Sequence, residues 1–179
     1  MSTSDGGQLQ KDGLRLFEEG SYDQALETFE RAREAYVQAG ETLLTGEMLN
    51  NIGVIHRLKG RHEEALAALE SAREMFAKAG DRSREAQTLG NLGGLHAARD
   101  DYEAAVASYR QAIEIFGELG EGDFQGETYM ALGLLQFKHG QRTDGLAAYE
   151  AGLLAVKRPT ARQRSLRALL KLRQRLLGG

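Results

Sequence analysis

Apolar residues recur along this chain with helical spacing, and a helix-stopping residue follows every twenty positions. Glycine occupies positions 20, 40, 60, 80, 120 and 140, and Asp100 takes the remaining place. Glycine enters the left-handed conformation that ends helices at little cost, and aspartate tolerates it better than most residues. Between the stops, every segment has the spacing of an amphipathic helix. The pattern therefore predicts an all-α chain.

The predicted helix that contains Asn91 has two distinct sides when its residues are placed about 100° apart. One side carries Leu89, Leu92 and Gly93, and the other carries Gln87, Asn91, Gly94 and Ala98. We expect the first side to pack against a neighbouring helix and the second to be offered to a partner.

The whole pattern repeats every forty residues, which is the length of two predicted helices. Residues 22–32 realign with 62–72 and 102–112, and more loosely with 142–152. A strictly periodic chain stacks its units in a row instead of closing around one centre. We therefore expect four helix pairs, over about 6–45, 46–85, 86–125 and 126–156.

Small and large residues alternate together in every repeat. The eighth position is always glycine, at Gly13, Gly53, Gly93 and Gly133, and the second helix carries the bulky Phe29, Leu69, Tyr109 and Tyr149. Glycine lets the second helix approach closely, and the bulky residue fills the gap between pairs. With the small Ala25, Ala65, Ala105 and Gly145, this combination resembles the tetratricopeptide repeat family over residues 6–156.

The resemblance implies a right-handed α-solenoid whose first helices line a concave groove. The family usually repeats at about 34 residues, and the longer spacing here, with Leu89-Gly90-Asn91-Leu92-Gly93, looks like its Leu-Gly-Asn-rich subclass. Members of that subclass act as scaffolds or receptors for extended peptides. Peptide-sensing bacterial regulators also have similar repeats, commonly after an N-terminal effector domain, for which residues 1–7 leave no room.

Three asparagines, Asn50, Asn51 and Asn91, all fall inside first helices, where asparagine lowers helix propensity. Asn51 and Asn91 share the sixth position, which faces the groove in a solenoid. A carboxamide both donates and accepts, so it can hold a peptide unit without reading its side chain. The resemblance implies this role for asparagine at that position. The alternative is that these are tolerated exposed amides.

Other groove positions would supply specificity. Gly94 leaves the floor open for a peptide backbone, Gln87 and Arg57 are polar, Lys138 lies near the end of its helix, and Met130 offers apolar anchoring in the fourth repeat, which lacks the asparagine. For any one of these side chains, a solvated surface role is the alternative.

The C-terminal residues differ in charge from the rest. Residues 1–156 carry a net charge of −11, whereas residues 157–179 carry eight Lys and Arg residues and no acid. Pro159 breaks the chain, and Thr160 with Gln163 predicts a capping box that opens a last helix over about 160–176. Ser21 with Gln24 predicts another box. Leucines on one side of the last helix should cover the end of the solenoid.

The opposite side of the last helix carries a stripe made of Arg164, Arg167, Lys171 and Arg175. It could contact an acidic protein, a nucleic acid or an anionic membrane, or serve only as the solvated face of a cap. The negative charge of residues 1–156 and the lack of aromatic residues between the basic ones argue against nucleic acid as the partner. A further alternative is that the leucine side pairs with another copy, which would make the protein a self-associating module.

Composition excludes several classes of function. The chain has no cysteine, so disulfides and thiol chemistry are ruled out, and no catalytic or phosphate-binding motif occurs. His56 and His96 share a repeat position, but helices about 8–10 Å apart and the lack of further ligands favour packing over a metal pair. No apolar run approaches 18 residues. We expect a cytoplasmic, non-catalytic adaptor without cofactor or metal, whose partner is another protein.

Overall fold

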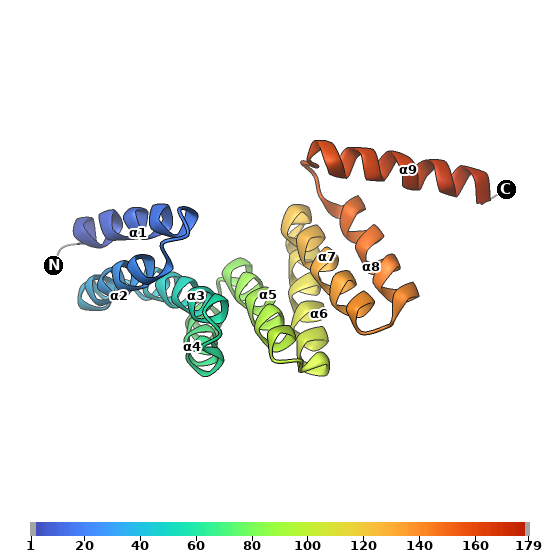
Figure 1. Ribbon diagram of the computed structural model, residues 1–179. Helices are drawn as coiled ribbons and strands as arrows, with labels where there is room; N and C mark the ends of the chain where they lie inside the picture. Colours follow the sequence, from blue (N-terminus) through green and yellow to red (C-terminus); the bar gives the residue numbers. More distant parts are fainter. Residues whose placement is uncertain (1–2, 178–179) are drawn as a thin grey trace.

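The computed structural model describes residues 3–177, and the side chains of residues 5–170. Within this range all regular structure is helical, and the helices stack in chain order with α1 and α9 at opposite ends (Figure 1). The predicted all-α solenoid is confirmed. Its helices are α1 (Thr3–Glu18), α2 (Tyr22–Ala39), α3 (Thr42–Leu58), α4 (His62–Ala79), α5 (Arg82–Ala98), α6 (Tyr102–Leu119), α7 (Gly122–Lys138), α8 (Arg142–Ala155) and α9 (Ala161–Leu177).

The connections turn at the predicted stops. At all six glycines φ lies between 69° and 83°, and Asp100 adopts a φ of 57° at the seventh place. At the end of α2 the Glu41 N–H donates to the Tyr36 carbonyl at 2.9 Å, which closes the turn around Gly40. The helix boundaries are therefore set by residues that accept a left-handed backbone.

Within each pair, the two helices meet where the first helix has glycine at the eighth repeat position. A Cβ atom added at Gly13, Gly53 or Gly93 would lie 2.6, 2.6 or 2.7 Å from the side chain of Phe29, Leu69 or Tyr109, respectively. Real side chains do not come this close, because interiors are already packed to the density of organic crystals. The predicted match of glycine with a bulky residue is confirmed in these three pairs.

The fourth pair, α7 with α8, is packed differently, because there the backbones themselves meet. A Cβ at Gly133 would lie 2.6 Å from the Gly145 carbonyl oxygen and 2.7 Å from the Tyr149 nitrogen. Gly126 has the same relation to the Gly152 carbonyl oxygen, at 2.7 Å. Four glycines therefore allow this pair to approach backbone to backbone.

The hydrophobic core runs along the stack instead of forming one centre. Each buried cluster joins helices of neighbouring pairs, as a solenoid requires. Central side chains of the three clusters are Phe29, Tyr36 and Met48; Leu69, Leu92 and Phe116; and Tyr109, Ile113 and Leu132.

Side-chain caps occur at some helix starts but not at the first one predicted. Ser21 makes no capping hydrogen bond, so the box predicted there is wrong. Instead, Asp81 accepts from the Arg84 N–H at 3.0 Å and Asp101 from the Ala104 N–H at 3.2 Å. The Asp residues satisfy N–H groups that the first turn of a helix leaves without partners.

The last helix begins as predicted. The Thr160 N–H donates to Gln163 Oε1 at 2.7 Å, and the Gln163 N–H donates to Thr160 Oγ1 at 3.3 Å, which is a reciprocal capping box. Leu166 and Leu170 are half-buried and line a hollow with α8, whereas Leu169 is 62% exposed. Helix α9 therefore covers the end of the stack only in part and projects from it (Figure 1).

We predict that Gly133→Ala destabilises the protein, because the new methyl group would meet backbone atoms that cannot rotate away. The free energy of unfolding should fall by about 1–3 kcal/mol, measured by urea denaturation followed by circular dichroism. Gly90→Ala is the matched control, since its Cβ would meet only Thr128 Oγ1 at 4.0 Å. That control should gain up to about 1 kcal/mol through helix propensity. Equal midpoints for the two variants would contradict the packing argument.

Candidate functional site

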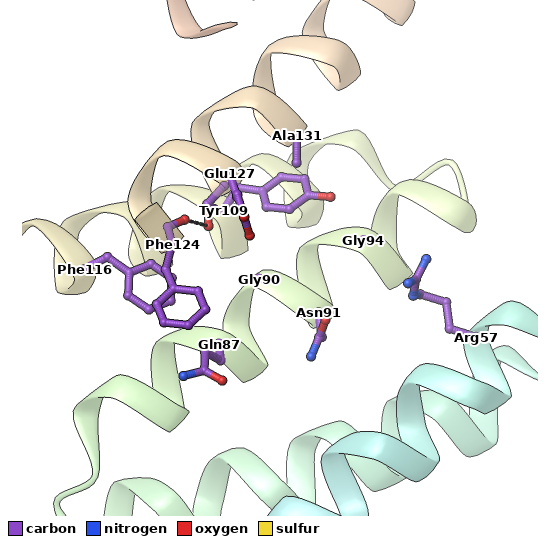
Figure 2. Close-up of a pocket in the computed structure, with 11 residues that line it drawn as sticks. Arg57, Gln87, Gly90, Asn91, Gly94, Tyr109, Phe116, Phe124, Glu127 and Ala131 are labelled. Carbon is purple, nitrogen blue, oxygen red and sulfur yellow. Dashed lines mark hydrogen bonds between the residues drawn. The ribbon is translucent and has the colours of Figure 1, made fainter. Parts of the chain in front are cut away.

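Within the described part of the chain, several hollows lie on the side of the solenoid formed by the first helices, and two of them have volumes of about 210 Å³ or more. The larger one, with a volume of about 380 Å³, lies mainly between α5 and α7, and Figure 2 shows its lining side chains. It is lined by Arg57, Gln87, Gly90, Asn91, Gly94, Tyr109, Phe116, Phe124, Glu127, Thr128 and Ala131.

A second hollow, of about 210 Å³, lies on the N-terminal side of Asn91. Asn91 lines both hollows, so the two are neighbours along the face. Asn51, from the preceding repeat, lines this second hollow with Asn91, and the rest of its lining is largely apolar. The other lining residues are Leu14, Phe17, Phe29, Asn50 and Val54.

The asparagines also bind one another. Nδ2 of Asn91 donates to Oδ1 of Asn50 at 2.9 Å, a bond that joins α5 to α3. A carboxamide offers two N–H donors and two acceptor lone pairs, so each of these amides keeps hydrogen-bonding groups beyond the one it uses. Asn51 makes no side-chain hydrogen bond within the described part of the chain. The bonded neighbour of Asn91 is thus Asn50, a pairing that the repeat pattern of the sequence does not predict.

We call the line along which α3 and α5 lie side by side the α3–α5 seam. A second polar contact joins the two helices nearer the N-terminal end of this seam. Arg84 bonds Asp81 at 2.6 Å and reaches Glu47 across the seam at 3.7 Å. Burial alone would raise the pKa of Asp81, but the N–H and guanidinium of Arg84 together hold that pKa below its ordinary value. Asp81 is therefore ionised at neutral pH, and it fixes Arg84 beside Gln87, which lines the larger hollow.

At the C-terminal end of the seam, Arg57 of α3 extends towards α5. A Cβ added at Gly94 would lie 3.8 Å from Arg57 Cζ and 3.6 Å from Tyr109 Oη. Tyr109 is 8% exposed, and burial raises the pKa of its hydroxyl against the opposing effect of the Arg57 charge. The hydroxyl is therefore protonated at neutral pH and able to donate a hydrogen bond into the hollow.

Aromatic side chains close the opposite end of the larger hollow. The rings of Phe116 and Phe124 stack with centroids 5.4 Å apart, and Phe124 is 43% exposed (Figure 2). Phe124 is not among the candidates predicted from the sequence, and the repeat pattern predicts only a packing role for Tyr109. The available signal is an exposed aromatic in the first turn of α7, where the preceding repeat has Arg84.

Family models described as tetratricopeptide repeat match residues 13–78 and 86–119, which together make up more than half of the chain. The chain belongs to the tetratricopeptide repeat family. Repeats of this kind present extended concave surfaces to binding partners, so the protein carries a protein-interaction module. No curated protein matches the sequence.

Solved structures share the fold at low identity. One is BtubC (BKLC) from P. vanneervenii, with a TM-score of 0.72, 21% identity, and coverage of 93% of this chain and 64% of that one. Another is the Rap conjugation gene regulator of the plasmid pLS20 in complex with the Phr* peptide, with a TM-score of 0.75, 18% identity, and coverage of 97% and 53%. The tetratricopeptide chain spans less than two thirds of the length of either of these two proteins.

Two of the predicted binding residues, Met130 and Lys138, lie outside both hollows. Met130 packs within the fourth pair, where a Cβ at Gly152 would lie 2.8 Å from its Cγ, and it does not line either hollow. Lys138 is exposed at the end of α7, 3.5 Å from Asp100 Oδ1. Tertiary packing thus separates both residues from the candidates that meet at the α3–α5 seam.

The residues of the predicted basic stripe on α9 do not share one environment. Arg167 donates to the carbonyls of Leu153 and Val156 at the end of α8, so it ties α9 to the last repeat instead of facing solvent. Arg164 is exposed and donates to the Pro159 carbonyl at 3.1 Å. The side chains of Lys171 and Arg175 lie outside the described residues.

The described part of the tetratricopeptide chain contains no group of three or more side chains suited to hold a metal ion. His56 and His96 are half-buried among the helices, and burial lowers the pKa of His56. None of the described helices has the length and apolar character needed to cross a bilayer.

We predict that Asn50 and Asn91 stabilise the repeats jointly. In a double-mutant cycle with alanine, their coupling should be about 0.5–1.5 kcal/mol, the usual contribution of one hydrogen bond. The cycle for Asn51 and Asn91 is the control and should give a coupling near zero, because these two amides do not bond each other. Urea unfolding of the single and double variants measures both, and equal couplings would argue against the bond.

Proposed function

We propose that the face formed by α3, α5 and α7 binds an extended segment of another protein through its main chain. The observation that supports this most directly is that Asn51 and Asn91, one repeat apart, line the same hollow with hydrogen-bonding groups to spare. An extended segment carries one N–H and one C=O per residue, and a carboxamide can satisfy both.

The asparagine bond supports the proposal by fixing one amide in place. Because Asn91 is held by Asn50 at 2.9 Å, it loses less conformational freedom when a ligand arrives. The apolar walls of the smaller hollow, which include Leu14 and Phe17, exclude water from the hydrogen bonds of the bound segment. Since the segment itself must become ordered on binding, micromolar affinity is the expected range.

The Rap regulator structure adds support of a coarser kind. Its description names a bound peptide, Phr*, and the fold of that protein matches 97% of this chain. At 18% identity the likeness shows a common fold, and the ligand belongs to that protein alone. The shared fold makes peptide binding on the concave side a reasonable proposal for this chain, in line with the role expected from the Leu-Gly-Asn-rich spacing.

We predict that Asn51→Ala combined with Asn91→Ala weakens peptide binding. A displayed library of random short peptides, selected on the wild-type protein, would supply the ligands. The dissociation constant of a selected peptide should rise about tenfold or more, since at least two hydrogen bonds are lost. Fluorescence anisotropy measures the affinity, and circular dichroism checks that the helical content is unchanged.

Asn50→Ala provides the matched control for that experiment. It breaks the bond to Asn91 but leaves the amides of Asn51 and Asn91 available, so its effect on affinity should be clearly smaller than that of the double variant. An unchanged dissociation constant in the folded double variant would reject the proposed role of the amides.

The alternative function, self-association, draws on a different surface. The hollow between α8 and α9, of about 420 Å³, is almost entirely apolar, and leucines remain exposed around it. Leu146, Leu154 and Leu169 are 48%, 53% and 62% exposed, respectively. Burying this surface against a second copy would remove apolar area from water.

If the protein self-associates through this surface, Leu169→Glu should shift it to the monomer, because the carboxylate would be buried without a partner. Light scattering coupled to gel filtration measures the change. Leu134→Glu is the control, since Leu134 is also 62% exposed but lies on α7. A wild-type protein that is monomeric at all concentrations, or an equal response of both variants, would exclude this function.

A further inference from the structure

The guanidinium of Arg57 stands out among the cations near the α3–α5 seam. Its Nε is buried without a hydrogen-bond acceptor, and within the described part of the chain it forms no ion pair. Other cations of α5 and α7 are paired: Arg84 with Asp81 and Lys138 with Asp100, as is Arg99, the residue after α5, with Glu63.

A buried N–H donor without an acceptor is costly, because it has lost water and gained no hydrogen bond in return, and the Nε–H of Arg57 is such a donor. Because residue 94 is glycine, the point between it, Arg57 and Tyr109 is free of a side chain. A point one bond from the Gly94 backbone lies 3.8 Å from Arg57 Nε and 3.6 Å from the hydroxyl of Tyr109. A small anion placed there would meet both the guanidinium and the protonated tyrosine hydroxyl.

The charges of the larger hollow favour an anion with a single charge. Among the side chains that line it, Arg57 is the one cation and Glu127 the one anion. A carboxylate matches a guanidinium with two parallel hydrogen bonds, whereas a phosphate would bring a second negative charge into a body whose net charge over residues 1–156 is −11. The chemistry therefore favours a carboxylate.

The opposite end of the hollow carries two aromatic rings, and its distance from Arg57 sets a spacing. Figure 2 shows Phe116, Phe124 and Gln87 at one end and Gly94 with Arg57 at the other. Gln87, which lines the hollow with Phe124, lies seven positions before Gly94 on α5, a rise of about 10 Å. An extended chain covers that length in about three residues.

We propose that the larger hollow selects a segment with an acidic side chain bound by Arg57 and Tyr109 over Gly94, and an apolar or aromatic side chain bound at Phe124, about three residues away. This inference rests on the proposed function, since it names which segments that face would bind. It assigns Arg57 and Phe124 to specificity and leaves main-chain binding to the asparagines.

The test compares peptide libraries selected on the wild type and on Arg57 variants. Displayed peptides with a blocked C-terminus report side-chain carboxylates alone. The wild type should enrich Asp or Glu at a fixed spacing from an apolar residue. Arg57→Gln should lose the acidic enrichment and keep the apolar one, and Arg57→Glu should enrich Lys or Arg in its place. Arg73→Gln, which removes an exposed charge on α4, is the matched control and should select like the wild type.

One selected acidic peptide and its Asn or Gln analogue complete the test. Arg57→Gln should weaken the acidic peptide by about tenfold or more and should leave the analogue unchanged. Gly94→Leu should weaken the acidic peptide as well, because it fills the space while keeping the charge. Circular dichroism confirms that each variant is folded.

The outcomes separate this inference from the function on which it rests. Wild-type peptides without acidic enrichment, or an acidic enrichment that survives Arg57→Gln, would overturn the carboxylate site while leaving peptide binding intact. Binding only of peptides with a free C-terminus would replace the side-chain carboxylate with a terminal one and overturn the inferred spacing. A wild type that selects no peptide would overturn the proposed function and this inference together.

Discussion

The contact between a glycine on the first helix and a bulky side chain on the second sets the geometry of the first three helix pairs. In the first three pairs a Cβ on that glycine would lie within 2.7 Å of the facing side chain, so no larger residue fits unless that side chain or its helix shifts. Because the same contact recurs every forty residues in these three pairs, they repeat one geometry. The first helices consequently lie side by side and form a continuous face.

That face is held together at the α3–α5 seam by polar contacts as well as by packing. Arg84 with Glu47 and Asn91 with Asn50 bridge the two helices. These polar groups are only half-buried, so water or a ligand can still reach the hydrogen-bonding capacity that they do not use. Arg57, at the end of the same seam, is the exception, because its Nε has no acceptor within the described part of the chain.

The C-terminal end of the solenoid departs from this repeating geometry. Four glycines bring α7 and α8 into backbone contact, and the residue after α8, Val156, leaves the helix in an extended conformation. Arg167 then donates to the carbonyls of Leu153 and Val156 at the C-terminal end of α8, where a cation complements the negative end of the helix dipole. Helix α9 is therefore attached at its beginning and leaves apolar surface on α8 exposed, including Leu154.

The sequence by itself determined the helices, their stops and the pairing of Gly53 with Leu69, because these depend on local conformation and on a period that every repeat obeys. It did not reveal that Asn50 is the bonded neighbour of Asn91, that Phe124 and Tyr109 line a hollow, or that Arg167 turns towards α8. These features depend on how far each pair is rotated relative to the next, which is the summed result of packing along the stack. A side chain at a given repeat position can therefore be assigned to a face from the sequence, but its partner on the neighbouring repeat is decided by the tertiary structure.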